Sequence, residues 1–304
     1  VESTYDSRNQ LKTRKWYDAI IPSGSTSDVA DARVDFIYTA AGREKLSLRY
    51  SDLTATTKVG STDTTYDLAG RTDKLIHNDA IDALLSNYDY DYDFSSLLTD
   101  ETRNHKENQY DQSISYAYDL TGQLVDAVFS GQDDEHYVYD LNGNRLSSTV
   151  GAGHHTYTTG TANQLKTDGV YNYAYDGEGN LKLKIRISDG QVTENFWDHH
   201  NRLFKVEERS VGGIVLKTVE YEYDTFGRRT TEIVNGAATL RVVHSRDDTW
   251  GDYNKTGEFE TNYLYTNNID QMVAAFRTTE GLVWYNSDRL GTVRSLTNAS
   301  GLLG

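Results

Sequence analysis

The feature that most constrains the fold of this chain is a short recurring phrase, Tyr-Asp with Gly four residues after the Tyr. Asp at the first position of a type I turn can accept a hydrogen bond from the backbone two residues on, and Gly at the fourth position tolerates positive φ. Each phrase therefore predicts a reversal between antiparallel strands, made by a type I turn with a G1 bulge. The copies are Tyr66, Asp67 and Gly70; Tyr118, Asp119 and Gly122; Tyr139, Asp140 and Gly143; Tyr175, Asp176 and Gly179; Tyr223, Asp224 and Gly227.

Degenerate copies of the phrase follow the same rule. Asn, the other residue that readily adopts the left-handed conformation, can replace the Gly. These copies pair Gly42 with Tyr38, Asn9 with Tyr5 and Asn201 with Trp197, four residues apart in each case. We expect Gly143→Val or Gly179→Val to cost about 1 kcal/mol or more. Replacement of Gly60, which lies outside any phrase, need not destabilise the fold in this way.

The segments before the phrases alternate aromatic and polar residues with period two, as in Tyr171, Tyr173 and Tyr175, which predicts strands with one Tyr-lined face. A lone hairpin is marginally stable, so the hairpins should stack edge to edge into one long sheet that coils because strands twist. The predicted fold class is all-β: repetitive antiparallel β-hairpins stacked into a long coiled sheet, a spiral or shell. We expect a single continuous array over residues 1–304.

Composition excludes several classes of partner. The formal net charge of -16, from 46 acidic and 30 basic residues, disfavours nucleic acid, because phosphate contacts need clustered Lys and Arg. No apolar stretch approaches the roughly 20 residues of a spanning helix, so membrane insertion is not expected. The absence of Cys removes disulfides and thiolate chemistry. The first residues show no signal peptide.

Together the phrases resemble the YD-repeat (RHS-repeat) superfamily, which includes bacterial RHS proteins, toxin-complex shell proteins and teneurins. The resemblance runs from Tyr5 to Gly301. Residues 284–301, WYNSDRLGTVRSLTNASG, resemble the DHLGSVR-type segment of the RHS-associated core. The matching residues include Asp288, Leu290, Gly291 and Arg294, whereas Arg289 and Thr292 stand where His and Ser are common.

The resemblance implies a hollow β-shell that encloses or displays a partner polypeptide, in bacterial members a carboxyl-terminal toxin domain. It also implies a secreted or cell-surface bacterial protein whose export signal lies outside this chain. The family's self-cleaving aspartates follow the DHLG-type segment, and this sequence stops at Gly304. We therefore interpret the chain as an excerpt of a larger protein, with its own flanking domains, an enclosed polypeptide or other copies as partners.

Candidate chemistry has simpler structural explanations. The repeated Asp residues have a turn role that explains their spacing, and no privileged carboxylate pair emerges for a glycosidase. His154-His155 and His199-His200 lack metal-ligand spacing. We predict no catalytic residue, cofactor or metal site, and a carbohydrate-acting enzyme is the least favoured alternative.

One segment, NYDYDYDF from Asn87 to Phe94, leaves two alternatives open. Asp89, Asp91 and Asp93 would share one strand face and could bind a hard cation such as calcium, although EF-hand spacing is absent. A strand with Tyr inside and Asp in water is favoured. Because Tyr-rich faces can stack on sugar rings, an adhesive or glycan-binding filament remains the alternative function to a non-catalytic shell.

Overall fold

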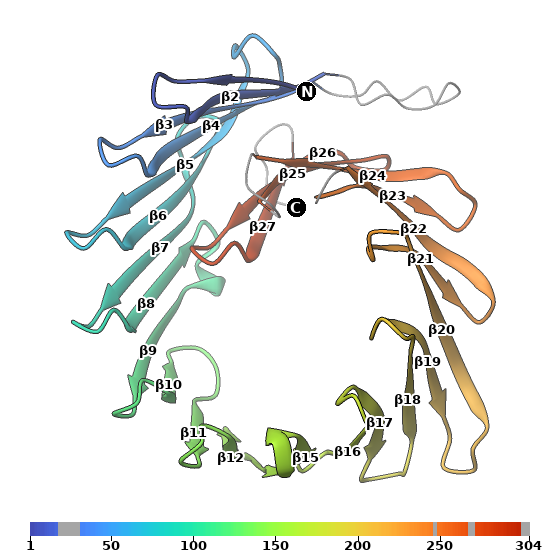
Figure 1. Ribbon diagram of the computed structural model, residues 1–304. Helices are drawn as coiled ribbons and strands as arrows, with labels where there is room; N and C mark the ends of the chain where they lie inside the picture. Colours follow the sequence, from blue (N-terminus) through green and yellow to red (C-terminus); the bar gives the residue numbers. More distant parts are fainter. Residues whose placement is uncertain (18–30, 246–247, 267–270, 299–304) are drawn as a thin grey trace. The chain divides into compact units, whose positions relative to one another are not determined.

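The computed structural model describes residues 1–17, 31–245, 248–266 and 271–298, and these residues form β-strands joined by short turns (Figure 1). The predicted all-β class of antiparallel hairpins is confirmed. The last residues of the DHLG-type segment, 299–301, lie outside the described residues.

The strands are β1(Glu2–Tyr5), β2(Leu11–Trp16), β3(Ala32–Tyr38), β4(Glu44–Tyr50), β5(Lys58–Tyr66), β6(Thr72–Asp79), β7(Leu84–Tyr92), β8(Leu98–His105), β9(Gln112–Tyr118), β10(Leu124–Phe129), β11(Glu135–Tyr139), β12(Arg145–Val150), β13(Gly153–Thr156), β14(Thr158–Thr159), β15(Leu165–Thr167), β16(Tyr171–Tyr175), β17(Leu181–Arg186), β18(Val192–Trp197), β19(Leu203–Arg209), β20(Val215–Tyr223), β21(Arg229–Val234), β22(Ala237–Ser245), β23(Asp248–Asn254), β24(Phe259–Tyr265), β25(Met272–Arg277), β26(Gly281–Ser287) and β27(Val293–Asn298). In the part of the chain that the structure describes, two short 3-10 helices, η1(Asn108–Tyr110) and η2(Thr161–Asn163), lie between strands.

Each strand pairs with its neighbours in the sequence. Within the described residues, β1 to β13 form one sheet in chain order and β14 to β27 form a second. The single sheet that we expected is interrupted at Tyr157, between β13 and β14. The Tyr157 amide still donates to the Leu146 carbonyl oxygen at 2.8 Å, so it extends the pairing of β12 with β13, and Thr158 then begins a new ladder with β15.

Period-two burial follows the Tyr pattern. In β16, Tyr171, Tyr173 and Tyr175 are half-buried while Asn172 and Ala174 between them are exposed. In β7, Tyr88 and Tyr90 are fully buried, at 0% and 3% exposure. Large rings on one face of a strand remove apolar area from water while polar residues keep the other face hydrated.

The strands group into two compact units. Unit 1 comprises Val1–Ile114, His244–Asp252 and Phe259–Gly304, and unit 2 comprises Ser115–Val243 and Tyr253–Glu258. Unit 1 therefore joins segments that are far apart in the sequence. Its core packs β2, β3 and β5 against β24 to β26, through Leu11, Trp16, Ala32, Val34, Phe36, Val59, Leu264, Ala274, Leu282 and Trp284.

No helix within the described residues is long and apolar enough to cross a membrane.

Candidate functional site

The Tyr-Asp phrases form one repeated turn. In the first full copy, the Gly70 amide donates to the Asp67 carbonyl oxygen at 2.9 Å, and the Asp67 amide donates to the Arg71 carbonyl oxygen at 2.9 Å. The ladder shifts register next to Tyr66, which pairs with Thr72. Positive φ marks the Gly of every full copy: Gly70 +84°, Gly122 +82°, Gly143 +82°, Gly179 +91° and Gly227 +81°.

The Asp carboxylate of each phrase accepts hydrogen bonds from backbone amides of its own turn. Asp140 Oδ1 accepts the amides of Asn142 and Asn144, both at 2.8 Å. The Asn144 side chain and these amides lower the pKa of Asp140. Corresponding two-amide contacts occur at Asp119, Asp176 and Asp224, and Asp67 Oδ1 accepts the Arg71 amide. These oxygens therefore bind the backbone of their own turns.

The ring of the phrase makes a second contact, which we call the cross-hairpin bond. Tyr92 Oη donates to the Thr72 carbonyl oxygen at 2.9 Å, and Thr72 is the first strand residue after the preceding turn. The bond thus ties one hairpin to the hairpin before it. The other examples are Tyr38 to Leu11 at 2.7 Å, Tyr66 to Glu44 at 2.6 Å, Tyr175 to Leu165 at 3.0 Å, Tyr223 to Leu203 at 2.6 Å and Trp197 Nε1 to Leu181 at 3.0 Å.

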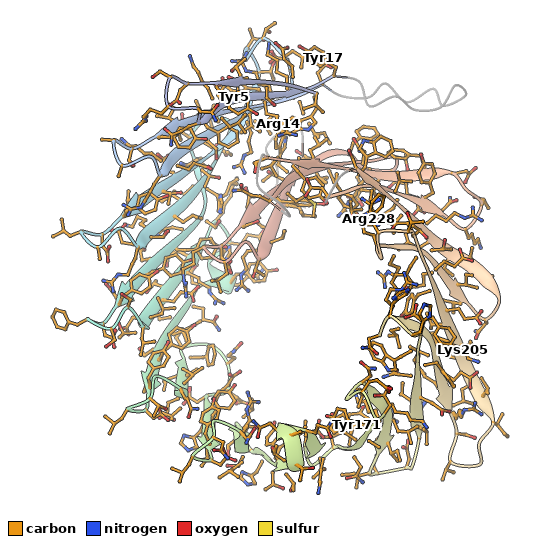
Figure 2. The ribbon with its side chains drawn as sticks, viewed as in Figure 1. Tyr5, Arg14, Tyr17, Tyr171, Lys205 and Arg228 are labelled. Carbon is orange, nitrogen blue, oxygen red and sulfur yellow. The ribbon has the colours of Figure 1, made fainter. Side chains whose placement is uncertain are left out.

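The residue five positions after the Tyr reaches in the other direction, to the next turn. Asn180 Nδ2 donates to Asn201 Oδ1 at 3.0 Å, and Arg71 Nη1 donates to the Asp93 carbonyl oxygen at 2.8 Å. Gln10 and Asn144 make similar contacts with Gly42 and Asn163. Where the copy has both Asp and an Arg at this position, the Arg also pairs with the Asp of its own turn, as Arg71 does with Asp67 and Arg228 (labelled in Figure 2) with Asp224.

The DHLG-type segment is a turn of the same kind, with Ser287 in place of Tyr. Gly291 has φ +82°, its amide donates to the Asp288 carbonyl oxygen at 3.0 Å, and Ser287 pairs with Val293 across a register shift. Asp288 is 6% exposed, and its Oδ1 accepts the amides of Leu290 and Thr292. Its Oδ2 accepts Arg294 Nε and Nη2, each at 2.7 Å.

This turn, with β26 and β27 on either side, docks onto the strands of the amino-terminal half within unit 1 (Figure 1). Arg49 Nη1 on β4 donates to Asn286 Oδ1 at 2.9 Å, and His77 Nε2 on β6 lies 3.0 Å from the Ser287 carbonyl oxygen. The Arg289 guanidinium lies 5.3 Å from the centre of the Tyr90 ring, where a cation–π contact contributes about 0.5–1 kcal/mol or more.

Burial shifts the charge states of this docking contact. Burial lowers the pKa of Arg49 to about 10, partly offset by Glu44. Burial, together with the charge of Arg49, lowers the pKa of His77 to about 3, so the imidazole is neutral at physiological pH. A neutral imidazole facing a carbonyl oxygen must carry its proton on Nε2, since the carbonyl can only accept.

Further turns lie outside the phrases named from the sequence: those at Asp79, Asp93 and Ser210, which have the same backbone hydrogen bonds, and two more. Gly160 takes the place of Asp in one of these two, and Asn163, at φ +56°, takes the place of Gly. In the other, Asn254 replaces Asp, and its Oδ1 accepts the amides of Thr256 and Glu258. The spacing of Tyr253 and Gly257, four residues apart, could have revealed the second copy.

The side chains considered as possible cation ligands make different contacts in the structure. Asp89 pairs with Lys74 at 2.8 Å, Asp91 is exposed, and Asp93 Oδ1 caps a turn at the Leu97 amide. Among the described residues, no three His, Asp or Glu side chains are arranged to hold a metal ion. His199 and His200 are exposed in their turn.

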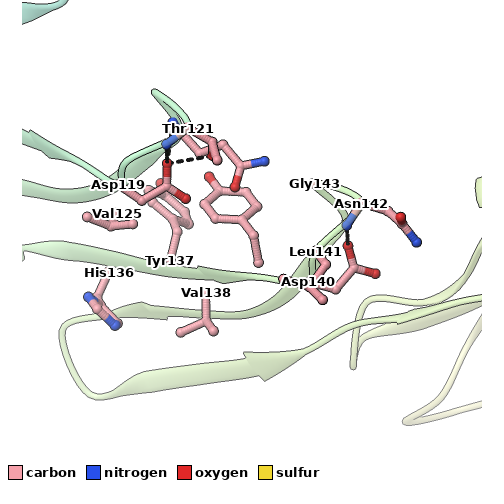
Figure 3. A pocket seen from close by; sticks show the side chains of 12 residues that line it. Asp119, Thr121, Val125, His136, Tyr137, Val138, Asp140, Leu141, Asn142 and Gly143 are labelled. Atoms are coloured by element: carbon pink, nitrogen blue, oxygen red, sulfur yellow. Dashed lines mark hydrogen bonds between the residues drawn. The ribbon is translucent and has the colours of Figure 1, made fainter.

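An open hollow of about 650 Å³ lies in unit 2, beside the turns that follow Tyr118 and Tyr139 (Figure 3). Asp119 and Asp140 stand on its rim, and their Oδ1 atoms accept turn amides. Its polar rim therefore consists largely of groups already used by the repeat.

Two structural matches are the Photorhabdus luminescens Tc holotoxin pore, with 14% sequence identity and a TM-score of 0.42, and the TcdB2-TccC3 crystal structure, with 12% and 0.49. They cover 98% and 99% of this chain, which spans only 19% and 18% of theirs. No curated protein matches.

The decisive comparison is with protein-family models. The model of the teneurin YD-shell matches residues 32–303. The match extends across both compact units and includes the DHLG-type turn. It confirms the resemblance to YD-repeat proteins, and the chain belongs to the teneurin YD-shell family.

Proposed function

We propose that this chain is a non-catalytic structural segment of a shell that encloses a partner polypeptide. The observation that carries the proposal is the set of cross-hairpin bonds, because they join successive hairpins into continuous walls with the Tyr rings on one face. A wall of this kind excludes protease and solvent sterically, without a reactive group. Membership of the YD-shell family supports the structural role.

The Tyr-lined face is the one that would meet the enclosed polypeptide. Aromatic rings offer large apolar area at low entropic cost, and their hydroxyl groups adapt to varied backbone partners. The parent protein would be a secreted or surface bacterial protein, and the partner would be one of its own flanking domains or a separate chain.

A cross-linking experiment tests the enclosed partner. A photoreactive phenylalanine analogue would replace Tyr171 on the Tyr-lined face (Figure 2) in the parent protein. The control position is Leu141, whose side chain is fully exposed at a turn tip in the same unit. We expect cross-links to a polypeptide segment from position 171 and none to that segment from position 141. Equal cross-linking from both positions would contradict enclosure.

A second candidate function is glycan binding or adhesion. The rings of Tyr171 and Tyr173 lie 6.4 Å apart on one face of β16 and remain partly accessible, which suits stacking on sugar rings. Glycan-array binding that is lost in Tyr173→Ala but retained in Asp176→Ala, with both variants folded, would favour this function. Absence of binding to any glycan would remove it.

A further inference from the structure

The hairpin formed by β26, the Asp288 turn and β27 is held by a buried imidazole. His77 is 2% exposed, and both of its ring nitrogens have partners: Nε2 lies 3.0 Å from the Ser287 carbonyl oxygen and Nδ1 lies 2.8 Å from Thr62 Oγ1. The carbonyl oxygen requires a proton on Nε2, so Nδ1 of the neutral ring accepts from the Thr62 hydroxyl. One neutral side chain therefore joins β5, β6 and β26.

The groups around His77 leave little compensation for a second positive charge. Arg49 on β4 holds Asn286, the residue next to Ser287, and the charge of Glu44 only partly offsets the effect of burial on its guanidinium. Buried cations without a paired carboxylate are costly. On β7, the Tyr88 ring lies edge-on to His77 at 6.1 Å, and on β8, His105 lies edge-on to Tyr88 at 5.9 Å.

The acidic group of the hairpin is already used. Asp288 accepts two turn amides through Oδ1 and pairs with Arg294 through Oδ2. A proton on His77 would therefore place a second cation near Arg49, and it would require the Thr62 hydroxyl to stop donating to Nδ1.

We propose that the β26–β27 hairpin is an acid-released latch. Protonation of His77 would release the hairpin from the surface formed by strands β4 to β7. At neutral pH the imidazole donates to Ser287 and the hairpin is closed. At lower pH the open hairpin is favoured because the freed imidazole can bind its proton in water. The contact of β26 and β27 with β4 to β7 in unit 1 would then be controlled by pH.

The direction of the pH dependence follows from linkage. The pKa of His77 is lowered to about 3 when docked, below the ordinary value of 6.5. A depressed pKa contributes docking stability that is present above about 6.5 and declines as the pH falls toward 3. Between pH 7.5 and 5.5 the equilibrium constant for opening should rise about tenfold.

Hydrogen exchange measured by mass spectrometry tests the latch in the full chain. After correction for intrinsic exchange rates, the amides of β26 and β27 should lose about tenfold protection between pH 7.5 and 5.5. The amides of β16 to β20 in unit 2 should keep their protection, which separates hairpin release from global unfolding. Unchanged protection of β26 and β27 would overturn the proposal.

The variant His77→Gln provides the matched test, because its amide can donate to Ser287 but cannot take up a proton in this range. Its hairpin should remain protected at both pH values, and His200→Gln, changed in an exposed turn, should respond like the wild type. A wild-type pH response in His77→Gln would overturn the latch. If His77→Gln fails to dock, nuclear magnetic resonance of the wild-type His77 ring decides: protonation while the hairpin amides stay protected overturns the proposal, and protonation coincident with their exposure supports it.

Discussion

Trp197 Nε1 donates a hydrogen bond to the Leu181 carbonyl oxygen at 3.0 Å, in the place where other repeats use a Tyr hydroxyl. In the next repeat, Tyr223 Oη donates to the Leu203 carbonyl oxygen at 2.6 Å and so makes the corresponding bond to the preceding hairpin. Where the cross-hairpin bond forms, it thus requires a flat ring with a donor at its far end. Trp and Tyr meet that requirement, whereas Phe does not.

Variants of Trp197 test this requirement. Trp197→Phe should have a free energy of unfolding about 1 kcal/mol lower than Trp197→Tyr, because only Tyr restores a donor to the Leu181 carbonyl oxygen. Urea unfolding followed by circular dichroism measures the difference, and Tyr92→Phe against wild type repeats the test in unit 1. Equal stability of the two Trp197 variants would show that the ring alone matters.

Two glycines in one turn provide a matched test of backbone conformation. Gly179 has φ +91°, whereas a Cβ on Gly177 would meet open space and its φ lies outside the left-handed range. Gly179→Val should therefore lower the free energy of unfolding by about 1 kcal/mol or more, and Gly177→Val by much less. Thermal melts of the two variants make the comparison, and coincident melts would contradict it.

Gly60 is not the tolerant position that its sequence suggested. A Cβ there would lie 2.6 Å from the Asn78 carbonyl oxygen and 3.3 Å from Arg49 Nη2. Gly60→Ala should lower the free energy of unfolding by about 1–3 kcal/mol through overpacking. Gly131→Ala, with no atom within 4 Å of the new Cβ, is the control in a thermal melt. Equal melting temperatures would mean that β5 and β6 separate easily.

The aspartates of the turns should make the stability of the fold sensitive to acid. The Arg202 amide, opposed by desolvation and assisted by the Arg202 side chain, lowers the pKa of Asp198 to about 2. Because the folded pKa lies below the ordinary 3.8, this carboxylate stabilises the fold above about pH 4 and loses that effect as the pH falls toward 2. The carboxyl carbon chemical shift of Asp198, followed by nuclear magnetic resonance as the pH is lowered, should give a titration midpoint well below 3.8. A midpoint near 3.8 would show that the turn amides do not bind the carboxylate.

The repeat was largely predictable because its residues act locally. Asp67, Gly70 and Arg71 complete their turn within a few positions, and the period-two Tyr pattern identifies the strand face. The degenerate copy at Gly160 escaped because it keeps neither the Tyr nor the Asp, although Asn163 preserves the left-handed position. Backbone geometry is thus retained more strictly than side-chain identity.

The docking of the DHLG-type turn could not be predicted, since its contacts join residues that no periodicity relates. Arg49 and Asn286 lie 237 positions apart, and His77 and Ser287 lie 210 apart. The crowding at Gly60 has a different origin, since it comes from the Asn78 carbonyl oxygen in the same hairpin and from Arg49 on the adjacent strand β4. At Arg49 and His77, a tertiary contact overrides what a strand residue would do in an isolated hairpin.

The cross-hairpin bonds and the forward contacts of Arg, Asn and Gln connect each repeat only with the repeats beside it. Duplication of one hairpin with its turn would give the new ring a carbonyl oxygen to bind and offer a matching carbonyl oxygen to the ring that follows. Removal of one hairpin would likewise rejoin two compatible neighbours. The length of such a wall can therefore change in evolution by whole hairpins, with no redesign of the turns that remain.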